Sequence, residues 1–169
     1  SVPNQCAALA GHLRQADTLF GFCRGSTGAR IASTTTRPTQ PAAIHWCDGS
    51  DAEDSQLVSL MLSTGDLVKL NESSHPNCYL HRSDPSDVAR VEHLTFVCTP
   101  NRDSAGPNNN WMAPQDALAK MAGLFAGAMQ GRTMYVIPYC MGPIDSPYAR
   151  CGVEITDSAY VAANMRLMT

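Results

Sequence analysis

The stretch IHWCDGSDAEDSQLVSLMLSTG, residues 44–65, joins a short apolar strand to a helix whose two ends are both marked. Ser50 and Glu53 form a capping box, in which the two residues satisfy free amides at the helix start. Gly65 is placed to end the helix. Apolar residues at helical spacing predict its buried face: Leu57, Leu60 and Met61. The stretch therefore predicts a strand followed directly by a helix, a unit typical of mixed folds.

Strand and turn signals dominate the segment that follows. Residues 66–71 and 77–81 are typical of two strands around a turn, and residues 94–98 alternate like a further strand. Residues 99–111 carry turn-forming residues without an apolar period, so we expect a long exposed loop there.

Helix and strand signals return in the last third of the chain. Residues 114–130 predict a helix, with Pro114 in its first turn and Gly131 after its last. Two strands are predicted in TMYVIPYC (133–140) and CGVEIT (151–156). Strands and helices thus interleave, which predicts an α/β, or mixed α+β, fold.

The final stretch DSAYVAANMRLMT, residues 157–169, has a helix start but no stop signal. Thr156 or Asp157 is expected to cap it. Apolar residues then follow at helical spacing: Tyr160, Val161, Met165 and Met168. Because helices commonly end at Gly or Asn, and this one does not, we expect it to continue in a longer protein.

The first 39 residues differ in composition from the rest. Residues 1–24 contain a predicted helix over 4–22, and the Ser-, Thr- and Pro-rich residues 25–39 are predicted to be a linker or loop. The helix is interpreted either as a docking helix on a tether or as an organelle transit segment. Residues 40–169 form the predicted domain.

Composition and charge limit the classes of function. The 169 residues carry a net charge of −3, which divides into +3 over residues 1–40 (four basic, one acidic) and −6 over 41–169 (eight basic, fourteen acidic). An acidic body argues against a nucleic-acid surface. No apolar run approaches the ~20 residues of a membrane span. The seven cysteines include no C-x-x-C pair, which is typical of reduced thiols and argues against structural zinc.

Several catalytic motifs are missing. The two lysines, Lys69 and Lys120, stand in no G-x-x-x-x-G-K-[ST] phosphate loop. Four scattered histidines could converge on a metal, although such residues usually have ordinary surface or core roles: His45, His75, His81 and His93. The acidic residues between Asp48 and Asp54 gather at a helix start, where the helix dipole favours them without a catalytic role.

The segment RSDPSDVARVE, residues 82–92, presents Arg90 at the end of a short predicted helix. Asp84 can cap this helix, and Pro85 fits its first position. A guanidinium offers two parallel donors that match a carboxylate, so Arg90 is a candidate anchor for a small anionic substrate. An ordinary surface pair with Asp87 is the alternative.

Five strings resemble the GTP-dependent phosphoenolpyruvate carboxykinase family, in the order and spacing of its amino-terminal domain over residues 40–169. They are QPAAIHWCDGS (40–50), SDPSDVARVE (83–92), AGPNNNWMAP (105–114), GRTMYVIPYCMGP (131–143) and GVEITDSAYVAANMR (152–166). The resemblance implies the amino-terminal lobe of the carboxykinase fold without its nucleotide-binding lobe. Ala113 departs from the family, which usually places a capping Ser or Asp there, so this helix start is expected to fray.

The resemblance also implies a reaction, in which oxaloacetate and GTP give phosphoenolpyruvate, GDP and carbon dioxide, a step of gluconeogenesis. The family's DVAR arginine, which binds the substrate carboxylate, falls on Arg90. Mn²⁺ and Mg²⁺ serve with GTP, and their ligands, the nucleotide loop and the mobile lid belong to a carboxyl-terminal part absent from this chain. We therefore expect no catalytic or metal residue here, and no activity of this piece alone.

Two other interpretations remain open, a naturally truncated carboxylate-binding or interaction module and a structural lobe that needs the missing domain. The family implies oxaloacetate or phosphoenolpyruvate as ligand, GTP or GDP bound through the missing domain, and a monomer. A cytoplasmic location is expected, with the mitochondrial matrix as the alternative.

Overall fold

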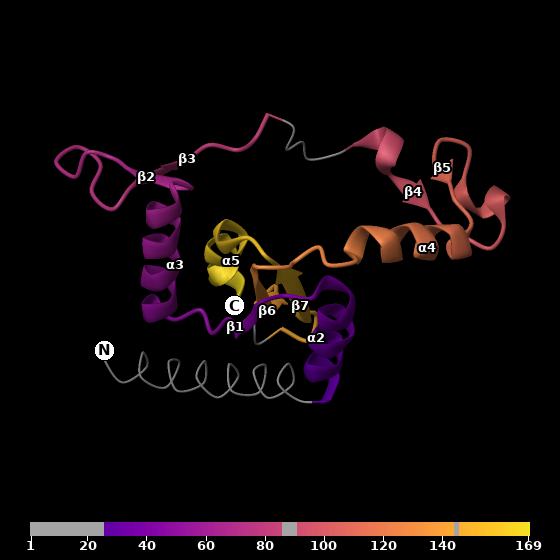
Figure 1. Ribbon diagram of the computed structural model, residues 1–169, viewed down its shortest axis with the longest axis horizontal. Coiled ribbons are helices and arrows are strands. Elements are labelled where there is room, and N and C mark those ends of the chain that lie inside the picture. Colours follow the sequence, from indigo (N-terminus) through magenta and orange to yellow (C-terminus); the bar gives the residue numbers. More distant parts are fainter. Residues whose placement is uncertain (1–25, 86–90, 144–145) are drawn as a thin grey trace.

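The computed structural model describes residues 26–85, 91–143 and 146–169, which include a three-stranded sheet (Figure 1). The sheet has the order β1–β6–β7, with β1 at Ala43–Trp46, β6 at Thr133–Met141 and β7 at Arg150–Thr156. Strand β1 runs parallel to β6, and β7 runs antiparallel to it. Helices and mixed sheets together confirm the predicted α+β class.

The sheet is the middle layer of three. Helices α3 (Asp51–Thr64) and α5 (Ala159–Met165) pack on the face that presents Tyr135 and Ile137 of β6. Helix α2 (Ser26–Thr39) contributes Ala32 to the opposite face, against Met134 and Val136. Both faces of β6 are therefore covered, which explains its nearly continuous apolar sequence.

Helix α3 has the ends that its sequence predicts. The Ser50 hydroxyl accepts the amide of Glu53 at 3.2 Å, and Gly65 ends the helix with a φ of 84°, a left-handed conformation that glycine adopts without strain. Leu57 and Met61 are buried, as predicted. The prediction is wrong for Leu60, whose exposed fraction is 44%.

A helix stands where the sequence predicts a loop over residues 25–39. The hydroxyls of Thr36 and Thr39 donate to backbone carbonyls four residues back, at 2.7 Å each, so these polar side chains satisfy themselves within the helix. The helix end is also held from outside, because the amides of Gly127 and Met129 donate to the carbonyls of Pro38 and Thr39. Tertiary contacts thus outweigh the weak local propensity. The helix predicted over residues 4–22 lies outside the described residues.

Smaller elements complete the fold. Strands β2 (Leu67–Lys69) and β3 (Tyr79–His81) pair antiparallel, as predicted. Strand β4 (Phe96–Val97) lies in the predicted strand 94–98, but it pairs in parallel with β5 (Asn110–Trp111), so the predicted loop 99–111 is partly structured. It also contains a 3₁₀ turn, Arg102–Ala105, and another 3₁₀ turn, Glu92–Leu94, precedes β4.

The last two helices differ in detail from prediction. Helix α4 spans Pro114–Phe125, five residues shorter than predicted, and Ala113 caps it without a side-chain hydrogen bond. The cap of α5 is Ser158, whose hydroxyl accepts the amide of Val161 at 3.3 Å, rather than Thr156 or Asp157. A 3₁₀ turn, Arg166–Met168, follows α5. None of the helices in the described part of the chain is long and apolar enough to cross a membrane.

The hairpin of β6 and β7 depends on a glycine. Tyr139 lies opposite Gly152, and a Cβ atom added at Gly152 would come within 2.7 Å of the Tyr139 ring. The tyrosine ring therefore occupies the space that any other residue at position 152 would need.

We predict that Gly152→Ala lowers the free energy of unfolding by ~1–3 kcal/mol, because the added methyl group forces the Tyr139 ring to move. Urea denaturation of the purified chain measures the change. Gly123→Ala in α4 is the matched control, since no atom lies within 4 Å of its added Cβ, and it should leave stability unchanged or raise it by up to ~1 kcal/mol. Equal stability of the two variants would contradict the role given to Tyr139.

Candidate functional site

Arg90, the residue that the sequence singles out as a substrate anchor, lies outside the described residues. The chain is described up to Pro85 and again from Val91. Its role therefore stays a prediction.

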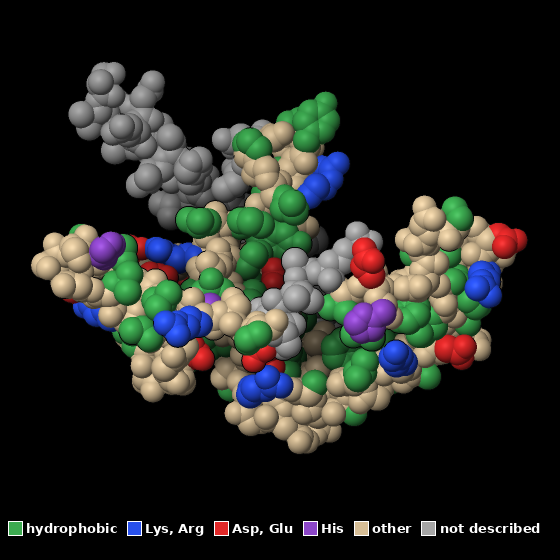
Figure 2. All heavy atoms as spheres, turned by 90° about the horizontal axis from the view of Figure 1, so that it is seen from above, with side chains coloured by type: hydrophobic (Ala, Val, Ile, Leu, Met, Phe, Trp, Pro, Cys, Tyr) green, Lys and Arg blue, Asp and Glu red, His purple; other side chains and the backbone are tan. Residues whose placement is uncertain are grey.

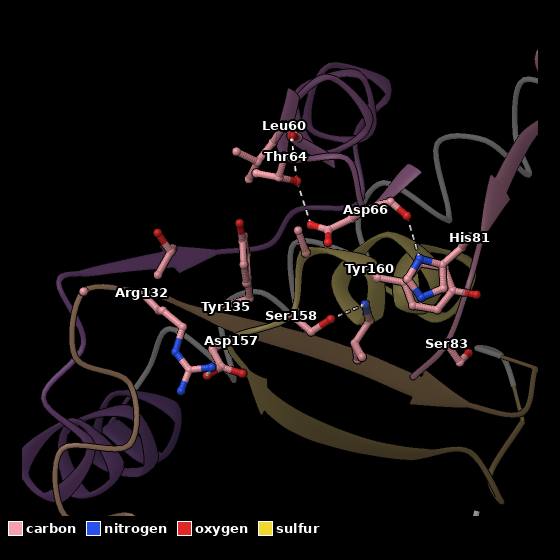
Figure 3. A pocket seen from close by; sticks show the side chains of 14 residues that line it. Leu60, Thr64, Asp66, His81, Ser83, Arg132, Tyr135, Asp157, Ser158 and Tyr160 are labelled. Atoms are coloured by element: carbon pink, nitrogen blue, oxygen red, sulfur yellow. Dashed lines mark hydrogen bonds and ion pairs between the residues drawn. The ribbon is translucent and has the colours of Figure 1, made fainter. Parts of the chain in front are cut away.

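An open cleft of about 510 Å³ lies beside the described end of that segment, between the carboxyl end of α3 and the start of α5 (Figure 3). Ser83, seven residues before Arg90, belongs to its lining. Titratable groups from four parts of the fold also line it: Asp66, His81, Arg132, Tyr135, Asp157 and Tyr160. The cleft is thus polar and built from segments far apart in the sequence.

His81 is held in one orientation at this cleft. Its Nδ1 lies 2.8 Å from the backbone carbonyl of Asp66. A carbonyl only accepts hydrogen bonds, so Nδ1 carries a proton, and Nε2 is the acceptor of the neutral ring. The ring also stacks on Tyr160, with centroids 3.8 Å apart and planes 18° from parallel. The stack joins β3 to α5 (Figure 3).

The charges of the cleft do not favour an anion. Arg132 is paired with Asp157, with Nη1 2.7 Å from Oδ2, and Asp66 adds a second carboxylate, which accepts the Thr64 hydroxyl at 2.6 Å. Arg132 therefore supplies one positive charge against the two negative charges of Asp157 and Asp66. The described lining alone therefore cannot account for tight binding of a dicarboxylate.

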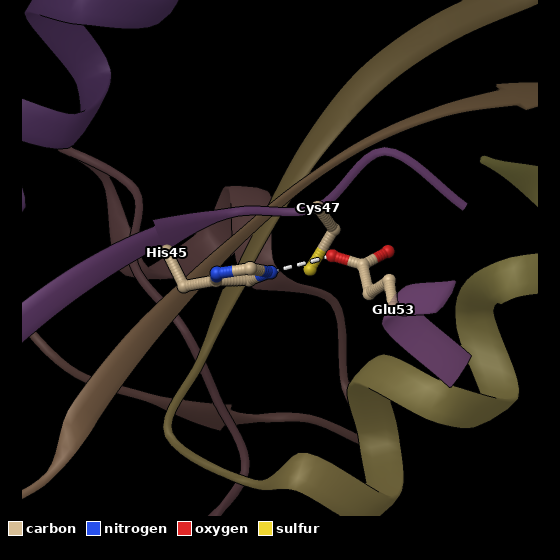
Figure 4. Close-up of side chains that lie close together, drawn as sticks. All are labelled: His45, Cys47 and Glu53. Atoms are coloured by element: carbon tan, nitrogen blue, oxygen red, sulfur yellow. Dashed lines mark hydrogen bonds and ion pairs between the residues drawn. The ribbon is translucent and has the colours of Figure 1, made fainter. Parts of the chain in front are cut away.

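A second cluster joins β1 to α3 through His45, Cys47 and Glu53 (Figure 4). His45 and Cys47 are two residues apart, so they point to the same side of the extended chain. His45 Nε2 lies 2.5 Å from Glu53 Oε1, and the Cys47 thiol lies within 4.8 Å of the same carboxylate. The other carboxylate oxygen, Oε2, accepts the amides of Asp48 at 3.0 Å and Gly49 at 2.8 Å.

Glu53 is therefore a buried carboxylate whose two oxygens both have hydrogen-bond partners. Its side chain is only 8% exposed. Burial, followed by the charge of Glu53, raises the pKa of Cys47 to about 12, so this thiol stays protonated at neutral pH and is no nucleophile. The three donor atoms lie within 4.8 Å of one another and are of the kinds that bind zinc. A metal would have to replace the hydrogen bonds that already satisfy them, so the cluster is best understood as a structural link.

Sequence reasoning missed this cluster. It assigned Glu53 to the capping box and set the acidic group aside, although the H-x-C spacing on a strand, followed by an acid in the next helix turn, was a usable signal. The sequence also allowed the four histidines to converge on a metal, and the described part of the chain does not support this. There, the one group that could hold a metal ion contains a single histidine, His45.

A three-layer lobe of helices and mixed sheets with a polar cleft defines a class of protein, a mixed α+β domain. The chain belongs to the phosphoenolpyruvate carboxykinase family, because residues 31–169 match the model of the phosphoenolpyruvate carboxykinase N-terminal domain.

Individual relatives agree with this assignment. The chain is 54% identical over 129 residues to the phosphoenolpyruvate carboxykinase (GTP) of Anaeromyxobacter dehalogenans strain 2CP-C, a match over 76% of this chain and 22% of the relative. It is 53% identical over 131 residues to the enzyme of the same name from Chlamydia pneumoniae, over 78% of this chain and 22% of that relative. The chain thus spans about a fifth of the length of the curated relatives that it matches.

We predict that Glu53→Ala lowers the free energy of unfolding by ~3 kcal/mol, because it leaves the amides of Asp48 and Gly49 and the His45 ring without their acceptor. Asp54→Ala is the control in the same helix turn. Asp54 is more exposed and lies 3.8 Å from Arg166, so its loss should cost less than ~1 kcal/mol. Similar urea midpoints for the two variants would show that the buried link does not support the fold.

Proposed function

We propose that this chain is the amino-terminal part of a phosphoenolpyruvate carboxykinase that converts oxaloacetate and GTP to phosphoenolpyruvate, GDP and carbon dioxide. The observation that carries the proposal is the 54% identity to a relative of that name. The match covers only 22% of the relative, so the remaining functions are assigned to protein beyond this chain. They include GTP binding and the coordination of Mn²⁺ and Mg²⁺.

Within this part, we assign to Arg90 a contact with the substrate carboxylate. The DVAR string carries this assignment by its resemblance to the family. The described lining of the cleft holds one arginine, already paired with Asp157, against two carboxylates, so it supplies no unpaired cation for a substrate carboxylate. An additional arginine would supply the bidentate donors that a carboxylate needs. The contact would position oxaloacetate rather than transfer a proton.

Exposed apolar side chains support a larger assembly around the chain. Helix α4 leaves four large hydrophobic residues at least 44% exposed: Leu118, Met121, Leu124 and Phe125. Figure 2 shows apolar side chains distributed over the surface of the molecule. Surfaces of this kind are usually covered by further protein. We propose that the carboxyl-terminal part of the enzyme covers some of them, within a monomer in the cytoplasm.

We predict that the purified chain has no carboxykinase activity in a coupled assay with oxaloacetate, GTP and both metal ions. Phosphoryl transfer depends on cations positioned around the transferred group, and these belong to the part that is absent here. The full-length Anaeromyxobacter enzyme is the positive control. Phosphoenolpyruvate formed at the rate of that enzyme would overturn the proposal that GTP and metal binding belong to protein beyond this chain.

The role of Arg90 is best tested in an active context, a chimera in which residues 41–169 of this chain replace the matching part of the Anaeromyxobacter enzyme. Arg90→Ala should lower kcat/KM for oxaloacetate by ~10²-fold, which corresponds to about 3 kcal/mol and is the order expected for a lost charged contact.

Arg102→Ala is the matched control for this experiment, because Arg102 is an exposed arginine on a 3₁₀ turn. It should retain the activity of the chimera. An Arg90→Ala chimera that equals this control would refute the assignment.

The alternative function, a binding module that acts without further protein, is tested by calorimetric titration of the isolated chain with oxaloacetate. Such a module would release heat on binding, and the heat would disappear in Arg90→Ala.

A further inference from the structure

Strands β6 and β7 place two cysteines directly opposite each other, Cys140 and Cys151. Residues paired in this way on antiparallel strands have Cα atoms about 4.5–5.5 Å apart, and their side chains share one face of the sheet. A disulfide requires a Cα separation of about 4.4–6.8 Å. The backbone therefore already has a spacing that accommodates a bond between the two sulfurs.

The two thiols are also neighbours and accessible. Cys151 lies opposite Cys140 across the two strands, close enough for Cys140 to affect its pKa. Cys151 is exposed and Cys140 is partly exposed. Burial, and then the neighbouring Cys140 side chain, raise the pKa of Cys151. Thiol–disulfide exchange at neutral pH therefore proceeds through the small fraction of Cys151 that is a thiolate. The Cys140 thiol lies beside it and can react in a second step.

The other cysteines of the described residues are placed differently. Cys47 is buried in the cluster with Glu53, and its pKa is raised to about 12. Cys78 is exposed and precedes β3, where its thiol donates to the Pro76 carbonyl at 3.5 Å. Cys98 is exposed after β4. The register of β6 and β7 thus distinguishes Cys140 and Cys151 from these three.

We propose that Cys140 and Cys151 are a redox modification site, which closes to a reversible disulfide when the chain meets a low-molecular-weight disulfide such as glutathione disulfide. The thiolate of Cys151 attacks one sulfur of the oxidant, forms a mixed disulfide and releases one glutathione thiolate. The Cys140 sulfur, after losing its proton to solvent, attacks the Cys151 sulfur and releases the second glutathione. Two cysteine thiols are oxidised and one glutathione disulfide is reduced to two thiols.

The bond would close the connection between the two strands. This connection includes Gly142 and Pro143 on one side and Ser146–Ala149 on the other, and Tyr148 in it is 81% exposed. A crosslink at the base of a loop restricts the unfolded chain and holds the strand ends in register. We expect the oxidised chain to have a Tm higher than the reduced chain by about 5 °C. The proposal is independent of the carboxykinase assignment.

The sequence offers a direct readout. Trypsin cuts after Arg132, Arg150 and Arg166, so Cys140 and Cys151 fall in two different peptides, 133–150 and 151–166. The full chain is equilibrated with a series of glutathione to glutathione disulfide ratios, its free thiols are blocked with N-ethylmaleimide, and the digest is analysed by mass spectrometry. The expected product is the joined pair 133–150 with 151–166, which dithiothreitol separates.

Three variants define the outcome. Cys78→Ser should retain the joined peptides, whereas Cys140→Ser and Cys151→Ser should each abolish them and stop at glutathione on the remaining cysteine. Circular dichroism checks that each variant is folded, and either serine variant alone suffices for the comparison. The proposal is overturned if Cys140 and Cys151 each take up glutathione without joining, or if Cys140 joins Cys78 as often as Cys151.

Discussion

The buried carboxylate of Glu53 is the interaction on which the arrangement of this lobe depends. It accepts the amides of Asp48 and Gly49 and contacts the His45 ring, so it binds the end of β1, the turn after it and the first turn of α3. A buried charge is tolerated only when it is fully hydrogen bonded, and the removal of one partner leaves the others unsatisfied. The position of α3 on the sheet is therefore tied to one side chain that has few alternatives.

The same turn is also held from the carboxyl end of the chain. Arg166, just after α5, donates through Nε to the Gly49 carbonyl at 3.0 Å and contacts the carboxylate of Asp51. Helices α3 and α5 thus lie side by side on one face of β6, joined at their ends by this arginine and along their length by apolar packing. The polar cleft opens at the opposite end of α3, where the stack of His81 on Tyr160 connects β3 to α5.

The elements of the fold that could be predicted from sequence are those whose signals lie within a short window of residues. The ends of α3, the paired strands β2 and β3, and the strands β6 and β7 follow from caps, turns and periodicity within short windows. Helix α2 does not, because its stability comes from Ala32 packing beneath β6 and from amides donated by Gly127 and Met129. The capping box was half right. Ser50 accepts the Glu53 amide, but the Glu53 carboxylate turns inward to His45 and to amides preceding Ser50, a choice that only the position of β1 determines.

The site follows the same division between local and distant information. The DVAR string points to Arg90 without any structure, whereas the cleft beside that segment is assembled from α3, β3, β6 and α5 and has no signature in one window of sequence. Its described charges, one arginine against two aspartates, are close to balanced, so the cleft alone offers no strong field for a dianion. The described lining therefore leaves most of the electrostatic stabilisation of a bound anion to groups outside it. This agrees with the proposal that phosphoryl transfer belongs to a part of the enzyme beyond this chain.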